Sequence, residues 1–153
     1  MEAYHYTESG LDNVMVFGIV PCLDDDGDEV VTVPNIAGLH HAIAKEIVAH
    51  AAGISGKELR FLRTEMGLTQ VELAKVVHHD AQSVARWEKS ERNIAPTAEA
   101  LIRLLAIQRL KLEVEPEPIE ELSGRCIAGA APQPININGN DPTHYKPMEM
   151  MAA

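Results

Sequence analysis

The chain has 153 residues, which is enough for one domain, or for two small domains and a tail, and its net charge is −10. No run of 18 apolar residues and no basic-then-apolar N-terminal signal occurs, so we expect a cytoplasmic protein with no membrane span. The two cysteines lie far apart and form no Cys-x-x-Cys pair, so the sequence predicts no disulfide framework, no metal site and no cofactor.

The N-terminal region is rich in strand-forming residues. Tyr4 and Tyr6 alternate with polar residues, residues 14–20 are a short apolar run, and valines at 30–33 follow an acidic turn at 24–28. We expect a small antiparallel sheet of three strands. The alternating aspartates of the turn could bind calcium. However, the segment lacks the glycine and glutamate that a calcium loop requires, which favours a solvated acidic turn.

A helix follows the sheet. Pro34 ends the last strand, and Asn35 can cap a helix that reaches about His50. The apolar side chains that recur at helical spacing are Ile36, Leu39, Ile43 and Ile47. Residues 51–53, Ala-Ala-Gly, are a joint of small residues that we expect to link this helix to a second unit.

The second unit begins with capping signals. Ser55 and Glu58 have capping-box spacing at the start of a helix that Gly67 ends, and Thr69 and Glu72 repeat that spacing at the start of the next helix. The apolar residues expected to face inward are Leu59, Leu62 and Met66 in the first helix, Leu73, Ala74 and Val77 in the second, and Val84 and Trp87 in a third helix capped by Asp80.

The third helix carries long polar side chains on its other face. Gln82, Arg86 and Lys89 stand at i, i+4 and i+7 and share one surface. Glutamine can bond an adenine edge, and arginine a guanine edge, through two hydrogen bonds. We therefore predict that Gln82 and Arg86 read bases rather than being ordinary solvated residues. The positions expected near phosphates, at the rim or at a helix start, are Gln70, Ala81, Ser83 and Lys89.

These residues carry a family resemblance. Thr69-Gln70, Leu73-Ala74, Val84 and Arg86-Trp87-Glu88 resemble the helix-turn-helix of lambda-repressor-like (XRE-type) transcriptional regulators, over about residues 55–112. The resemblance implies an all-α domain that binds double-stranded DNA. The chain departs from the family at the turn. His78 replaces the usual glycine, and His79 replaces an aliphatic residue.

A longer resemblance includes the N-terminal region. Tyr4-His5-Tyr6-Thr7, residues 10–14, Gly38-Leu39-His40 and residues 56–63 are similar to bacterial proteins related to MqsA-type antitoxins. In that group a small β-containing domain precedes an XRE-type helix-turn-helix. Ser9 stands where relatives have a zinc-binding cysteine, so zinc is not implied. What the resemblance implies is a homodimeric, sequence-specific DNA binder that represses its own operon.

Charge is distributed unevenly along the chain. Residues 54–112 contain 10 Lys and Arg against 7 Asp and Glu, whereas the remainder contains 3 against 16. The acidic residues therefore lie outside the helical unit, and the positive charge lies where DNA would bind.

The C-terminal part of the sequence consists of an apolar helix and a segment rich in glutamate and proline. A helix capped by Thr97 and ending near Leu112 is apolar around much of its circumference, so it either forms a dimer contact or is enclosed within the monomer. From Glu113 onward glutamates cluster, and six of the nine prolines lie in the last 38 residues, which predicts a disordered tail. Ile135 and Ile137 could pair as a short strand on a partner.

The sequence thus predicts an α+β fold in three parts. An N-terminal domain with a small antiparallel sheet spans residues 1–52, an all-α lambda-repressor-like helix-turn-helix domain spans 53–112, and a disordered tail spans 113–153. We expect a repressor that binds a near-palindromic operator. The alternative is an antitoxin-type interaction protein that neutralises a toxin or another regulator. Catalytic motifs such as Gly-x-Ser-x-Gly, a phosphate-binding loop and His-Glu-x-x-His are absent, so we expect no enzyme.

Overall fold

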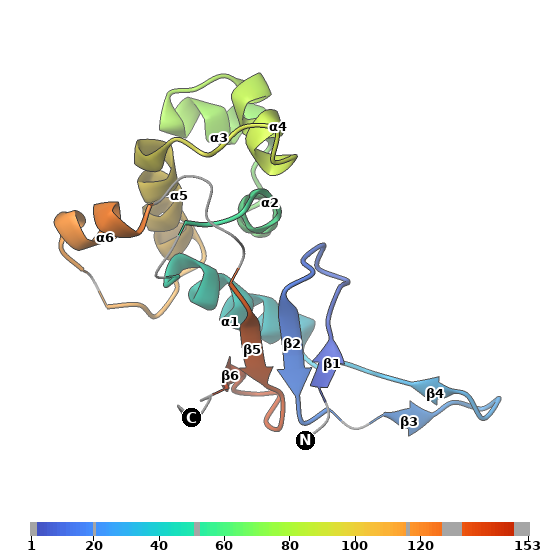
Figure 1. The fold of residues 1–153 in the computed structure, drawn as a ribbon. Coiled ribbons are helices and arrows are strands. Elements are labelled where there is room, and N and C mark those ends of the chain that lie inside the picture. Colours follow the sequence, from blue (N-terminus) through green and yellow to red (C-terminus); the bar gives the residue numbers. More distant parts are fainter. Residues whose placement is uncertain (1–2, 20, 51–52, 116, 127–132, 149–153) are drawn as a thin grey trace. The chain divides into compact units, whose positions relative to one another are not determined.

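The computed structural model of the protein has two compact units (Figure 1). The first consists of residues 1–43 and 134–153, and the second of residues 44–133. The residues that the structure describes are 3–19, 21–50, 53–115, 117–126 and 133–148. Strands and helices are both present, and the predicted α+β class is confirmed.

The first unit contains a four-stranded sheet with the order β1-β2-β5-β6 (Figure 1). Its strands are β1 (Ala3–His5), β2 (Val14–Phe17), β5 (Ile135–Asn138) and β6 (Lys146–Pro147). Strands β1 and β2 are antiparallel, as are β5 and β6, but β2 and β5 run parallel, with Val14 opposite Ile135. The expected sheet of three antiparallel strands is therefore wrong, because two C-terminal strands extend the sheet beyond β2, and the first of them is parallel to β2.

Strand β5 also corrects the expectation of a disordered tail over residues 113–153 where the structure describes them; residues 116, 127–132 and 149–153 lie outside the described residues. Ile135 and Ile137 are 1% and 0% exposed, and the asparagines beside them are only half-buried. This alternation is that of a strand with one face in a core, here next to the fully buried Val14 and Val16 of β2. Prolines flank the strand instead of interrupting it, so they remove no hydrogen bond from its ladder. Its partner is the chain's own β2 and not another protein.

A separate two-stranded ribbon follows β2. Strands β3 (Cys22–Leu23) and β4 (Glu29–Val30) pair around the predicted acidic turn. Asp24 Oδ1 accepts hydrogen bonds from the backbone N–H groups of Asp26, at 3.0 Å, and Asp28, at 2.8 Å. The turn is therefore closed by its own backbone and side chains, and all of its residues are exposed.

Helix α1 (Ile36–Val48) begins in the first unit and ends in the second. Its predicted stripe is buried at Leu39, Ile43 and Ile47, whereas Ile36 at the first turn is exposed. As expected, the Asn35 side chain caps the helix, accepting a hydrogen bond from the N–H of Gly38 at 3.2 Å.

The second unit is helical. It contains α2 (Gly56–Glu65), α3 (Gln70–Val77), α4 (Ala81–Glu88), α5 (Pro96–Arg109) and α6 (Ile119–Arg125). Helix α5 starts at Pro96, so the expected cap at Thr97 is wrong; proline suits a first helical position because its missing N–H has no partner there. Leu101 and Leu104 of α5 are 41% and 40% exposed, so the monomer does not enclose this helix. None of the described helices has the length and hydrophobicity needed to cross a membrane.

Truncation of a buried β5 side chain tests the unexpected strand. Ile137→Ala should lower the free energy of unfolding by about 2–4 kcal/mol, because a fully buried side chain is removed from a packed face. Ile119→Ala is the matched control, since Ile119 is 58% exposed and should change stability by less than about 0.5 kcal/mol. Urea titration of both variants measures the difference, and equal effects would show that residues 135–138 do not pack in the sheet.

Candidate nucleic-acid interface

Helix α3 begins with the predicted capping box. The Thr69 hydroxyl accepts from the N–H of Glu72, and the Glu72 carboxylate accepts from the N–H of Thr69, both at 3.1 Å. These hydrogen bonds from Thr69 hold the pKa of the Glu72 carboxyl below its usual value. Leu73 and Val77 are buried, as the spacing predicted, so α3 presents one apolar face to the core.

The turn between α3 and α4 contains the two departures from the family pattern. His78 ends α3 in the left-handed conformation, with φ 59° and ψ 41°, where glycine is the usual residue. Its backbone N–H donates to the carbonyl of Ala74, as does that of His79. The His79 ring meets the Trp87 ring edge-on, with centroids 4.8 Å apart. His78 therefore adopts the left-handed turn without a glycine, and His79 packs its ring against Trp87.

Helix α4 is held by a cap and by its apolar face. The Asp80 carboxylate accepts a hydrogen bond from the N–H of Ser83 at 2.7 Å, and this bond lowers the pKa of Asp80. Val84 and Trp87 are 0% and 2% exposed and fix the inner face. The outer face carries Gln82, Arg86 and Lys89, all exposed.

One carboxylate joins the three helices around the motif. Arg63 of α2 donates to both oxygens of Glu88 in α4, through Nε at 2.6 Å and Nη2 at 3.0 Å. Gln70 of α3 donates to the same carboxylate at 3.2 Å. Arg63 Nη1 also donates to the carbonyl of Leu68, before α3. The orientation of α4 is thus set from α2 and α3.

Close packing adds a second constraint at the end of α4. A Cβ atom at Gly56, the first residue of α2, would lie 2.3 Å from the carbonyl oxygen of Trp87 and 2.8 Å from that of Glu88. Only glycine fits where the start of α2 meets the end of α4.

The structure brings most of the predicted site residues together on α4. Gln82, Arg86 and Lys89 project from it, and Ala81 and Ser83 are half-buried in its first turn. Gln70 does not project outward in the same way, because its side-chain amide donates to Glu88. At this position only the backbone N–H is left to contact a phosphate. The sequence interpretation missed Arg60, which is exposed and lines a hollow of about 260 Å³ together with Lys89. The sequence does place Arg60 on α2 one helical turn before Arg63, and this spacing could have indicated a basic residue near α4.

Residues 59–107 match the family model described as helix-turn-helix. They form a DNA-binding helix-turn-helix domain of the XRE type. No curated protein and no solved structure shows significant similarity to the chain. The matched helix-turn-helix domain covers α3, α4 and most of α2 and α5, and it contains every predicted site residue.

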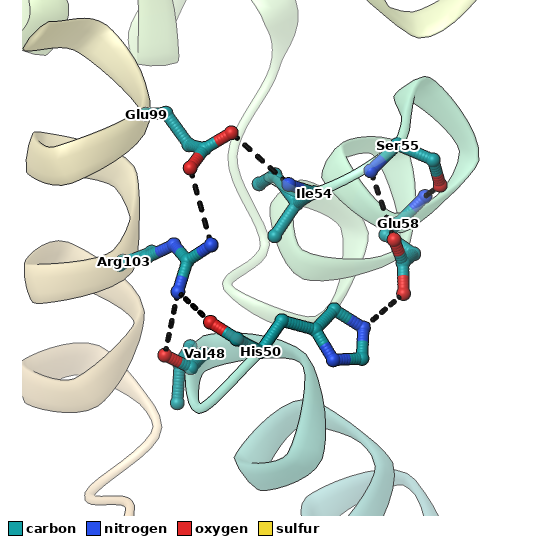
Figure 2. Close-up of polar contacts among 7 residues, drawn as sticks. All are labelled: Val48, His50, Ile54, Ser55, Glu58, Glu99 and Arg103. Atoms are coloured by element: carbon teal, nitrogen blue, oxygen red, sulfur yellow. Dashed lines mark hydrogen bonds and ion pairs between the residues drawn. The ribbon is translucent and has the colours of Figure 1, made fainter. Parts of the chain in front are cut away.

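Buried charges hold the helix-turn-helix domain to the residues before it (Figure 2). Arg103 of α5 is 0% exposed. Its Nη1 donates to the carbonyls of Val48, at 3.2 Å, and His50, at 2.9 Å, and its Nη2 lies 3.1 Å from Glu99. The other Glu99 oxygen accepts from the N–H of Ile54 at 3.0 Å. Helix α5 is therefore connected to both the end of α1 and the start of α2.

Glu58 completes this cluster at the first turn of α2 (Figure 2). One of its oxygens lies 2.6 Å from Nε2 of His50, and the other accepts from the N–H of Ser55 at 2.8 Å, within the predicted capping box. Burial alone raises the pKa of Glu58, but the hydrogen bonds with His50 and Ser55 outweigh burial. The resulting pKa lies below the ordinary 4.5. Among the described residues, no three or more His, Cys, Asp or Glu side chains come together in a group that could hold a metal ion.

The lowered pKa of Glu58 predicts a dependence of stability on pH. Since the folded-state pKa lies below the ordinary value, the unfolded chain binds more protons in acid. The contribution of Glu58 to the free energy of unfolding is fully present above pH 4.5. It is lost as the pH falls through the folded-state pKa of Glu58. Glu58→Gln should flatten this acid decline and lower the free energy of unfolding at neutral pH by about 1–3 kcal/mol, which urea titrations at several pH values measure.

The matched control is Glu120→Gln, at an exposed position of α6. It should leave both the stability and its pH dependence unchanged. If the free energy of unfolding falls with equal slope in acid for the parent chain and for Glu58→Gln, Glu58 is not the cause of the pH dependence.

Proposed function

We propose that this protein is a sequence-specific transcriptional regulator that represses by binding a near-palindromic operator as a homodimer. The observation that carries the proposal is the division of α4 into two faces. Val84 and Trp87 are buried, whereas Gln82 and Arg86 are exposed one turn apart on a helix fixed at both ends. An exposed helix face with these side chains suits the major groove.

The proposed contacts follow from the side chains on this face. Gln82 would bond an adenine edge, and Arg86 a guanine edge. Lys89 and Arg60, which share a hollow beside α4, would neutralise phosphates. Ser83 and the backbone N–H groups at the starts of α3 and α4, at Gln70 and Ala81, would bond phosphate oxygens.

Homodimerisation is proposed because one α4 helix can contact too few base pairs to select an operator. A single helix of eight residues, such as α4, can contact only a few base pairs. Two copies related by a two-fold axis place their reading helices about one DNA turn apart, roughly 34 Å, and so double the contacted sequence. Size-exclusion chromatography with light scattering on the operator complex tests this, and a complex with one copy of the chain would contradict it.

Removal of Arg86 tests base reading. Arg86→Ala should weaken binding to the selected operator by about 1–3 kcal/mol and should relax the base preference at one position of each half-site. Selection of binding sites from a random pool, followed by gel-shift titration of parent and variant, measures both effects.

Arg86→Lys is the control for charge. Lysine keeps the positive charge but lacks the planar group that bonds guanine through two donors, so base preference should relax while the salt dependence stays as in the parent. If Arg86→Ala binds the operator as tightly as the parent chain, Arg86 does not read a base and the proposed interface is wrong.

Removal of Lys89 tests a phosphate contact. Lys89→Ala should weaken binding to specific and random DNA by similar factors, because a phosphate contact carries no base information. It should also reduce the slope of log K against log salt by about one unit, as expected when one fewer counterion is released. A change of base preference without a change of slope would assign Lys89 to base reading instead.

The acidic ribbon β3-β4 favours a second candidate function. Leu23 is 73% exposed beside a turn with four acidic residues, Asp24, Asp25, Asp26 and Asp28, and Glu29 of β4 follows the turn. We propose this ribbon as the site where a basic toxin or other regulator would bind in the antitoxin-type alternative. Co-purification with the product of a neighbouring gene, lost on Leu23→Asp, supports this alternative, and a partner unaffected by that change argues against the ribbon.

A further inference from the structure

A groove of about 610 Å³ lies beside α5 and α6 in the second unit. Its apolar wall is formed by Leu104 and Ile107 of α5, Leu122 of α6, and Val48 and Val114. This volume falls within the range of protein sites that enclose small organic ligands, and such sites are mostly apolar with a few polar groups. None of the residues that line the groove belongs to α4.

The rim of the groove is acidic. It contains Glu115, Glu117 and Glu121, and Arg125 is the one basic residue among the described residues that line it. Arg125 Nη2 lies 2.9 Å from Glu117 Oε2, so these two charges compensate each other. Glu115 and Glu121 are both exposed and leave the rim with an excess of negative charge.

We propose that this groove binds a small organic cation with an apolar body, of the aromatic or alkylated ammonium or phosphonium class. The apolar body would be removed from water against Leu104, Ile107 and Leu122. A charge spread over a large cation is weakly hydrated, so little hydration is lost when it lies beside Glu115 and Glu121. An anion of the same shape meets the same wall but is repelled by the rim.

Helix α5 connects this site to the DNA-binding domain. It lines the groove with Leu104 and Ile107, and it also packs against α3 and α6. A ligand can change DNA affinity only if it favours one arrangement of α5 over another. This regulatory consequence rests on the proposed function, whereas the binding of the cation does not.

The test uses two ions of similar shape and opposite charge. Tetraphenylphosphonium and tetraphenylborate are titrated into the full chain by calorimetry. We expect one phosphonium ion per chain, and borate binding weaker by at least about tenfold.

Glu121→Gln should weaken phosphonium binding by about two- to fivefold, as expected for one exposed charge. Glu120→Gln, at an exposed neighbour outside the groove lining, should not. Ile107→Trp, which places a larger side chain in the apolar wall, should weaken phosphonium binding.

Several results would overturn the site. These are equal affinity for the two ions, equal effects of Glu120→Gln and Glu121→Gln, or no phosphonium binding. If phosphonium does not bind and Leu104→Arg dissociates a homodimer, the groove is covered by a second copy of the chain. Gel shifts with and without phosphonium separate the two proposals. A chain that binds phosphonium but no DNA keeps the cation site and loses only the proposed function.

Discussion

The arrangement of the helix-turn-helix depends on the carboxylate of Glu88. It receives two hydrogen bonds from Arg63 of α2 and one from Gln70 of α3, and it belongs to α4. Glu88 is 5% exposed as a side chain and Arg63 16%, so the pair is largely shielded from solvent, and ion pairs in such surroundings are screened little by salt. Because the two donors of Arg63 require one relative orientation, the contact sets the direction of α4 as well as its distance. The exposed face with Gln82 and Arg86 takes its orientation from this contact.

Helices α3 and α4 have eight residues each and would not be stable alone in water. Two kinds of interaction compensate for their length. Side-chain caps at Thr69 and Asp80 satisfy N–H groups at each helix start, and the buried side chains of both helices pack against the rest of the unit. The cluster around Arg103 extends this support to α5 and to the chain before α2. It is sensitive to change, since removing one member of a buried ion pair leaves the other uncompensated.

The first unit shows why composition alone misled the interpretation of the C-terminal segment. Glutamates and prolines dominate the segment from Glu113, yet Ile135 and Ile137 bury one face of a strand against β2. The strand has hydrogen-bonded neighbours on both sides, β2 and β6, and its two isoleucines lie beside the buried Val14 and Val16 of β2. Since β2 and β5 run parallel, they need a long crossover connection, and here that connection contains the β3-β4 ribbon, α1 and the whole second unit. The DNA-binding domain is thus connected through the chain to the first unit at both of its ends.

The sequence by itself determined the local features of this protein. Capping boxes, helical periodicity and the outward Gln82 and Arg86 depend on neighbours within a few residues, so spacing alone predicts them. The tertiary structure alone decided the pairing of β2 with β5, the choice of Arg63 and Gln70 as partners of Glu88, and the burial of Arg103. These contacts join residues that are distant in sequence. Many side chains of suitable type could have served, and only the folded chain selects among them.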